Sequence, residues 1–239
     1  MSARVVLVTG STSGIGEATA RRFAREGDHV VINSVRSVAA GEALAAELEG
    51  QYVQGDIAQE GDCARLIDAV LERRGRLDVL VNNAGVTRVI SHRDLGAASV
   101  EVWREIFEVN VFGTWQMTVA AMDALRQSAG AVVNVSSIAG LRPTGSSIPY
   151  AVSKAALNHM TALLAKVVGP EVRVNAVAPG LIDTPWTQDW DAIRAHVRSV
   201  APLRRSGSPN DVAEVIFALV GAKYVTGEVI TVDGGLTLT

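Results

Sequence analysis

The sequence of 239 residues is poor in several features, and each shortage excludes a class of protein. The single cysteine, Cys63, cannot form an intrachain disulfide and fits a reducing compartment. The four histidines show no metal-ligand spacing, so no metal site is expected. No block of lysine and arginine occurs and the net charge is −3, so neither nucleic acid nor an anionic membrane surface is an expected partner.

Long apolar runs are also missing. Near the N-terminus, the apolar residues 5–8 are followed at once by Thr9 and Gly10, which is too short a run for a signal peptide. No apolar stretch approaches the ~20 residues that cross a bilayer. With 48% apolar and 20% charged residues, the composition predicts a globular protein, and we expect a cytoplasmic enzyme or binding protein.

Short apolar runs alternate with longer amphipathic segments, which is typical of parallel strands joined by crossover helices. Strands are predicted at residues 5–9, 30–33, 52–53, 77–81, 132–136, 172–177 and 228–232. Helices are predicted at 15–26, 39–48, 62–74, 99–127, 150–168, 191–200 and 210–220. No linker or repeat interrupts the pattern, so residues 1–239 are expected to form one α/β domain. Its doubly wound, seven-stranded parallel sheet should carry helices on both faces, with ligands beyond the carboxyl ends of the strands.

A glycine-rich turn joins the first predicted strand to the first helix. Gly10, Gly14 and Gly16 are spaced G-x-x-x-G-x-G, with Ser13 and Ile15 between them. Gly10 permits the tight turn, Gly14 lets the backbone approach a pyrophosphate, and Gly16 lets the helix pack against the sheet. The free N–H groups at the helix start then face the anion, so this turn predicts a dinucleotide site.

Tyr150 and Lys154 stand four residues apart at the start of a predicted helix, so their side chains lie on one face. Ser137 follows the fifth predicted strand, thirteen residues before the tyrosine. A hydroxyl, a phenol and an ammonium brought together in this way form a proton-transfer group. Ser136 competes with Ser137 for the same role, and only the spacing to Tyr150 favours Ser137.

With the stretch 82–85 (Asn-Asn-Ala-Gly) after the fourth strand, these motifs resemble the compact branch of the short-chain dehydrogenase/reductase family. The resemblance covers residues 5–235 and implies a Rossmann-type fold. It also implies an NAD(P)-linked hydride transfer between the cofactor and a ketone or secondary alcohol. In this resemblance Tyr150 is the general acid/base, Ser137 binds the substrate oxygen, and Lys154 stabilises the phenolate and holds the nicotinamide ribose. Asn110 matches the family's helix asparagine, which carries a water that links the lysine to solvent.

The resemblance further implies which residues line the cofactor site. Asp56, followed by Ile57, corresponds to the acid that binds the adenine amino group. The stretch Asn83, Ala84 and Gly85 should run beside the adenine ribose, and Asn83 is expected to support the neighbouring strand rather than touch substrate. The nicotinamide side corresponds to Pro179, Gly180, Ile182 and Thr184.

Cofactor choice depends on the end of the second strand. An acidic residue there would bind the ribose 2′-hydroxyl of NAD, but this chain has Ser34, and Arg36 could pair with a 2′-phosphate. Against this, position 13 is serine, where many NADP-preferring relatives carry a basic residue. The balance favours NADP(H) over NAD(H).

The irregular segment at about 181–208 is expected to be a substrate lid. Apolar side chains in it, and Leu141, Pro143 and Ile148 before Tyr150, suggest walls for a small-molecule carbonyl or alcohol substrate. The substrate itself and the stereochemistry are not readable from the sequence. A 3-oxoacyl-carrier-protein reductase is one alternative, although the acidic Glu171 stands where such reductases tend to be basic.

Two alternatives from other classes are a non-catalytic dinucleotide sensor and a sugar-nucleotide epimerase. The sensor would typically have lost Tyr150, and the epimerase usually has a different glycine spacing and a longer chain. The long helix 99–127 carries more aromatic residues than one core needs, and in the family it pairs with the Tyr150 helix across subunits. The resemblance therefore implies a homotetramer.

Overall fold

A computed structural model describes residues 3–239 and contains one seven-stranded sheet in the order β3-β2-β1-β4-β5-β6-β7. All six pairs of neighbouring strands are parallel. The strands are β1 Val5–Val8, β2 His29–Ser34, β3 Gln51–Gln54, β4 Val79–Asn82, β5 Ala131–Val135, β6 Arg173–Pro179 and β7 Val229–Val232. The predicted doubly wound parallel sheet is confirmed, and each strand lies within two or three residues of its predicted position.

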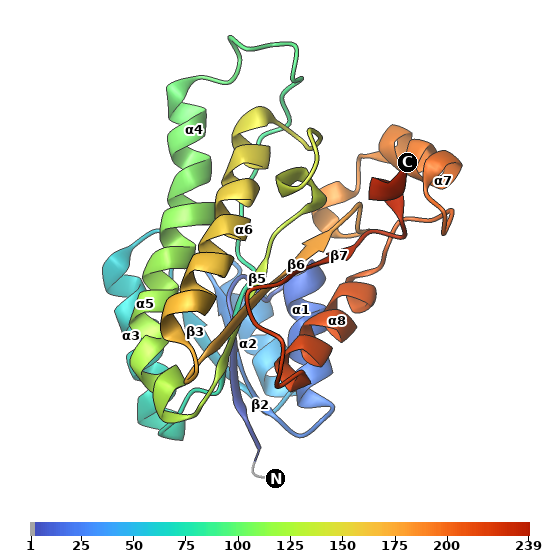
Figure 1. Cartoon of the computed structure of the whole chain (residues 1–239). Helices are drawn as coiled ribbons and strands as arrows, with labels where there is room; N and C mark the ends of the chain where they lie inside the picture. The colour runs from blue at the N-terminus through green and yellow to red at the C-terminus, as the bar shows by residue number, and fades with distance from the viewer. Residues whose placement is uncertain (1–2) are drawn as a thin grey trace.

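Helices cover both faces of the sheet, as Figure 1 shows. The long helices are α1 Gly14–Ala24, α2 Val38–Glu47, α3 Glu60–Arg74, α4 Val100–Phe107, α5 Thr114–Gln127, α6 Ile148–Val168, α7 Asp191–Val200 and α8 Pro209–Gly221. Helices α3, α5 and α6 pack on one face, and α1, α2 and α8 pack on the other. Because successive side chains of a strand point to opposite faces, Leu7 of β1 joins the first core, and Val6 and Val8 join the second. This is why β1 is apolar without interruption.

The segment predicted as one α-helix over residues 99–127 differs from that prediction in its middle. Between α4 and α5 lies a π-helical stretch, Glu108–Gly113, which includes Asn110. Residues of this stretch contact distant segments of the chain. Asn110 bonds to Val86 and Ser153, and Gly113 packs directly on Ile57. Single π-helical turns are rare and occur often at functional sites. Local helix propensity carries no signal for these tertiary contacts, so the sequence could not predict the interruption.

The segment after β6 contains a short turn, Pro185–Thr187, and then α7, which begins and ends where the sequence predicts. Arg194 of α7 holds the turn by donating hydrogen bonds to the carbonyl oxygens of Thr187 and Gln188, at 2.5 and 3.0 Å. The same guanidinium pairs with Asp183 at 2.7 Å. The turn is therefore tied to α7.

None of the helices within residues 3–239 combines the length and apolar character needed to span a bilayer.

Candidate active site

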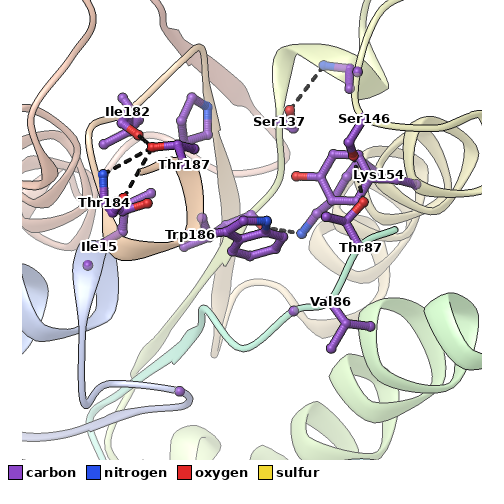
Figure 2. Close-up of a pocket in the computed structure, with 18 of the residues that line it drawn as sticks. Ile15, Val86, Thr87, Ser137, Ser146, Lys154, Ile182, Thr184, Trp186 and Thr187 are labelled. Atoms are coloured by element: carbon purple, nitrogen blue, oxygen red, sulfur yellow. Dashed lines mark hydrogen bonds between the residues drawn. The ribbon is translucent and has the colours of Figure 1, made fainter. Parts of the chain in front are cut away.

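A cavity of about 1130 Å³ opens at the carboxyl ends of the central strands, where parallel α/β sheets bind ligands. Figure 2 shows it with residues of the Pro185–Thr187 turn on one side and residues around Lys154 on the other. All predicted site residues except Gly16 and Asn110 line this cavity. They are Gly10, Ser13, Gly14, Ile15, Ser34, Arg36, Asp56, Ile57, Asn83, Ala84, Gly85, Ser137, Tyr150, Lys154, Pro179, Gly180, Ile182 and Thr184.

The glycine turn leaves room for an approaching pyrophosphate. Gly10 and Gly14 have positive φ angles of 61° and 57°, which other residues rarely adopt. Helix α1 begins at Gly14, and no side chain caps its first turn, so its N–H groups are free to bind an anion. Gly16 lies behind the turn, where an added Cβ would come within 2.5 Å of the Gly10 carbonyl oxygen. These residues fit a dinucleotide: Gly10 and Gly14 shape the turn, and Gly16 allows helix α1 to pack against it.

Asn83 holds the glycine turn against the end of β4. Its Nδ2 donates hydrogen bonds to the carbonyl oxygens of Thr9 and Gly10, both at 2.9 Å. In return, Thr9 Oγ1 accepts from the backbone N–H groups of Asn83 and Ala84 at 3.1 and 3.0 Å. Asn83 therefore fixes the shape of the cofactor cleft through the neighbouring turn.

At the far end of the cleft, the cavity residues at the end of β2 and just after it, from Asn33 to Ser37, are neutral or basic. The Ser34 hydroxyl lies 3.0 Å from the Tyr52 hydroxyl, which fixes the serine side chain. Arg36 is exposed at the cavity edge. On the neighbouring strand end, Asp56 accepts a hydrogen bond from the backbone of Ala58 at 3.0 Å, and its other carboxylate oxygen has lone pairs for a ligand.

Ser137 and Ser136 occupy different environments. Ser136 is buried and donates to the Lys154 carbonyl oxygen at 3.2 Å, so its hydroxyl is occupied. Both serines line the cavity, but the Ser137 oxygen caps a short turn by accepting from the Ala139 N–H at 3.1 Å. Its hydroxyl hydrogen stays available, and the Ser137 side chain contacts the Tyr150 phenol. The geometry thus favours Ser137 as the serine that reaches a substrate.

Tyr150 lies in the first turn of α6, where Ser147 Oγ caps the helix by accepting from its N–H at 3.3 Å. Lys154 follows one turn later, and its ammonium lies 5.7 Å from the centre of the Tyr150 ring. Burial raises the pKa of Tyr150, and the Ser137 hydroxyl acts in the opposite direction. Burial lowers the pKa of Lys154 to about 8, although its Nζ donates to the Val135 carbonyl oxygen at 2.8 Å.

Asn110 lies behind the cavity wall rather than in it. Its side chain is fully buried and bonds to both backbone groups of Val86, at 2.8 and 3.0 Å. It also donates to Ser153 Oγ at 3.0 Å. Gly85 separates it from the lysine: a Cβ on Gly85 would lie 3.2 Å from Asn110 Oδ1 and 3.6 Å from Lys154 Nζ. Asn110 therefore stands next to Lys154, with its amide engaged by protein groups.

The substrate side of the cavity differs from expectation on one wall. Trp186 lines it as predicted for the 181–208 segment, and its ring packs edge-on against Tyr150 with the centroids 6.4 Å apart. The residues 141, 143 and 148 do not line it, and the wall is built instead by residues 144–146. Gly145 in this wall has a φ angle of +118°. In this conformation of the loop, the Leu141 side chain points outward and is 39% exposed.

Two further hydroxyls line the cavity, those of Thr87 and Ser146. They lie 2.5 Å apart although 59 residues separate them in the chain. Each stands in a polar loop without a motif, so nothing in the sequence signals the contact.

Fold and site together define a Rossmann-type oxidoreductase, with a tyrosine and a lysine at the inner end of a dinucleotide cleft. Comparison with known proteins agrees. A family model described as enoyl-(acyl carrier protein) reductase matches residues 10–237. The chain belongs to the short-chain dehydrogenase/reductase family. It is an NAD(P)-dependent enzyme that transfers a hydride between the cofactor and a ketone or secondary alcohol.

Individual relatives cover essentially the whole chain. The chain is 61% identical over 241 residues to the "granaticin polyketide synthase putative ketoacyl reductase 2" of Streptomyces violaceoruber, covering 99% of this chain and 97% of the relative. A solved "putative short-chain dehydrogenase/reductase from Burkholderia xenovorans" has a TM-score of 0.92 at 40% identity, covering 100% of both chains. The structure titled "ElxO with NADP Bound" has a TM-score of 0.91 at 30% identity, again over 100% of both chains.

Proposed function

We propose that this enzyme uses NADPH to reduce the ketone of a ketoacyl substrate of the polyketide type. The observation that carries the proposal is the meeting of Ser137, Tyr150 and Lys154 where the cofactor cleft opens into the Trp186-walled half of the cavity. The substrate class is supported by the relative named as a ketoacyl reductase of a polyketide synthase, at 61% identity. The cofactor cleft takes up part of the cavity, and the remaining part beside Tyr150, walled by Trp186, would receive the acyl chain.

In the proposed mechanism, the protein positions the ketone and manages its proton. When bound, NADPH supplies the hydride. Ser137 donates a hydrogen bond to the ketone oxygen, which stabilises the charge that develops there in the transition state. Tyr150 gives its phenolic proton to the same oxygen. The nearby Lys154 ammonium stabilises the resulting phenolate and would hold the ribose hydroxyls of the nicotinamide half.

Asn110 acts in this proposal as a positioning residue. Its amide bonds to Val86, the residue after Gly85, and to Ser153, the residue before Lys154. The water that links the lysine to solvent would be held by the π-helical stretch around Asn110.

The rest of the cleft would hold the cofactor along its length. The phosphates would meet the N–H groups of Ser13, Gly14 and Ile15, and the adenine amino group would meet Asp56. The nicotinamide half would lie against Pro179, Gly180, Ile182 and Thr184. NADP(H) rather than NAD(H) is supported by the neutral and basic residues that follow β2 and by the similarity to the NADP-bound ElxO structure.

Cofactor preference is tested by two substitutions at the β2 end. We expect wild-type kcat/KM to be higher with NADPH than with NADH. Arg36→Ala should lower kcat/KM for NADPH about tenfold and leave NADH nearly unchanged, because one charged hydrogen bond to the 2′-phosphate is lost. Ser34→Asp should reverse the preference, since a carboxylate repels the phosphate and accepts the 2′-hydroxyl.

The matched control is Arg25→Ala, an exposed arginine outside the cavity that follows α1. It should leave both cofactors unaffected. If Arg36→Ala lowers kcat/KM equally with NADPH and NADH, the guanidinium does not bind the 2′-phosphate.

The alternatives are not favoured. A dinucleotide sensor does not need Ser137, Tyr150 and Lys154 around one cavity. The ketoacyl reductase relative and the Burkholderia xenovorans structure, which cover essentially the whole chain, do not carry an epimerase name. A dedicated 3-oxoacyl-carrier-protein reductase is not favoured either, because the relative at 61% identity is named for a polyketide synthase.

We further propose that residues 1–239 form one domain and that the 181–208 segment is its lid. Trp186 in that segment already contacts Tyr150, and the segment is pinned by the Arg194–Asp183 pair. A cytoplasmic location is supported by the lone Cys63, which suits reducing conditions.

A homotetramer is expected from apolar side chains that the monomer leaves exposed. On α4, the π-helical stretch and α5 they are Val100, Phe112, Trp115 and Val119, and on α6 they are Val152, Leu163 and Val167. Because α4 and α6 lie side by side in Figure 1, these residues could be covered by the same helices of another subunit. Light scattering should give four times the chain mass of 25.1 kDa, and a monomer mass would contradict the proposal.

The proposed reaction is tested with ethyl 3-oxohexanoate, a small β-keto ester, and 4-nonanone, which has the same chain length but a single carbonyl. Oxidation of NADPH is followed by its nicotinamide absorbance. We expect turnover of both ketones, faster for the ester. If neither ketone is reduced with NADPH or NADH, the proposed function is wrong.

A further inference from the structure

The hydroxyls of Thr87 and Ser146 form a pair in the substrate half of the cavity. Thr87 belongs to the loop after β4, and Ser146 to the loop before α6. Their oxygens are 2.5 Å apart, at the short end of the range for a hydrogen bond between hydroxyls. Figure 2 shows both on the same side of the pocket as Lys154, across from Ile182 and Thr184.

The pair lies beside the proposed catalytic groups. A Cβ on Gly145, the neighbour of Ser146, would lie 3.6 Å from Cδ1 of Tyr150. On the other side, a Cβ on Gly85, two residues before Thr87, would lie 3.6 Å from Lys154 Nζ. The two hydroxyls therefore lie close to the place where a ketone would be bound at Tyr150.

The pair can donate one hydrogen bond to a ligand. Two hydroxyls carry two hydrogens, and their mutual bond uses one of them. The remaining hydrogen has a poor protein acceptor, since the Arg88 carbonyl oxygen lies 3.4 Å from Thr87 Oγ1. In the chain O–H···O–H···O, the first bond polarises the second and makes it a better donor. The site therefore suits a hydrogen-bond acceptor on the substrate.

That acceptor should be neutral. Arg88, in the same loop as Thr87, is paired with Glu105 through two bonds of 2.7 and 3.1 Å, so its charge is already balanced. The Lys154 ammonium donates to the Val135 carbonyl oxygen and is assigned to the Tyr150 phenolate and the cofactor ribose, so a carboxylate at the hydroxyl pair would lose water without a cation of its own. A carbonyl oxygen gains a hydrogen bond there and carries no charge to desolvate.

We propose that Thr87 and Ser146 bind the second carbonyl of a β-dicarbonyl substrate and thereby select it over a simple ketone. This inference rests on the proposed ketone reduction. The second carbonyl orients the substrate so that its other carbonyl meets Ser137 and Tyr150. Thr87 and Ser146 are thus specificity-determining residues, and the reacting atoms remain those of the proposed mechanism.

The experiment compares kcat/KM for ethyl 3-oxohexanoate and 4-nonanone at saturating NADPH, in the wild type, in the single variants Thr87→Val and Ser146→Ala, and in the double variant that carries both substitutions. The backbone bond from the Ile90 N–H to the Ser146 carbonyl oxygen, at 2.8 Å, still joins the two loops in all three variants. The double variant should lower kcat/KM for the ester about tenfold and change that for 4-nonanone by less than about twofold, because the hydrogen bond to the second carbonyl is lost. Each single variant keeps one hydroxyl that can donate to this carbonyl and should have a smaller effect. Thr87→Ser, which keeps the hydroxyl, should retain the wild-type preference.

A matched control is Ser91→Ala, which removes an exposed hydroxyl from the same wall. It should leave both ketones unaffected. Equal losses for both ketones in the double variant, or no loss for either, would overturn the inference while wild-type turnover still supports the proposed function. A wild type that reduces neither ketone would overturn both.

Discussion

Tyr150→Phe should lose nearly all turnover, by about three orders of magnitude, and still bind NADPH with unchanged affinity. The phenol is the group that gives its proton to the ketone oxygen, and phenylalanine keeps the ring without the proton. The ring's edge-on contact with Trp186 should therefore survive in the variant. Turnover is followed by nicotinamide absorbance with ethyl 3-oxohexanoate, and NADPH binding by fluorescence titration.

The NADPH titration distinguishes a missing proton donor from a damaged cofactor cleft. Loss of turnover together with loss of NADPH binding would indicate a damaged cleft rather than a missing proton donor. Turnover within about tenfold of the wild type would remove Tyr150 from the general acid role, because general acids contribute at least ~10²-fold.

Lys154→Met should lower turnover by about 10²-fold to 10³-fold, the usual effect of removing one group that stabilises charge in the transition state. Methionine has a similar length and no charge, so it fills the space and cannot stabilise the Tyr150 phenolate. The same kinetic assay measures the loss. Lys154→Arg makes a useful comparison, since it keeps the charge and changes its shape. If Lys154→Met retains wild-type turnover, the ammonium is not needed for proton transfer.

Thermal or denaturant unfolding over a range of pH provides an independent readout for Lys154. Burial lowers its pKa from 10.5 to about 8 in the folded chain, so the charged form is disfavoured by folding. Below pH 8 this penalty is fully present, and it is relieved as the pH rises from about 8 to 10.5. The free energy of unfolding of the wild type should therefore rise relative to that of Lys154→Met across this window, by at most about 3 kcal/mol. A difference that does not change with pH would show that the lysine is not buried as an ammonium.

Much of the fold could be predicted because its signals are local. The uninterrupted apolar strands, the glycines at turns and the amphipathic helices each have a short-range pattern, and α7 occupies the predicted residues 191–200. All predicted site residues except Gly16 and Asn110 also come together at one cavity, at the edge of the sheet where the parallel strands end.

What could not be predicted depends on contacts between distant segments. The π-helical stretch accompanies the bonds of Asn110 to Val86 and Ser153, which no helix propensity encodes. The Thr87–Ser146 pair joins two loops 59 residues apart. The three apolar residues at 141, 143 and 148 were expected in the pocket on their hydrophobicity alone, but the loop that bears Gly145 places other side chains there.

The most direct test of the central claim is the transfer of deuterium to ethyl 3-oxohexanoate from NADPH that carries deuterium at both C4 positions of the nicotinamide. Mass spectrometry of the product should show one deuterium on the new carbinol carbon with the wild-type enzyme, and essentially no product with Tyr150→Phe. An unlabelled alcohol from the wild type, or the same labelled product at an undiminished rate from Tyr150→Phe, would contradict ketone reduction at the Ser137–Tyr150–Lys154 site.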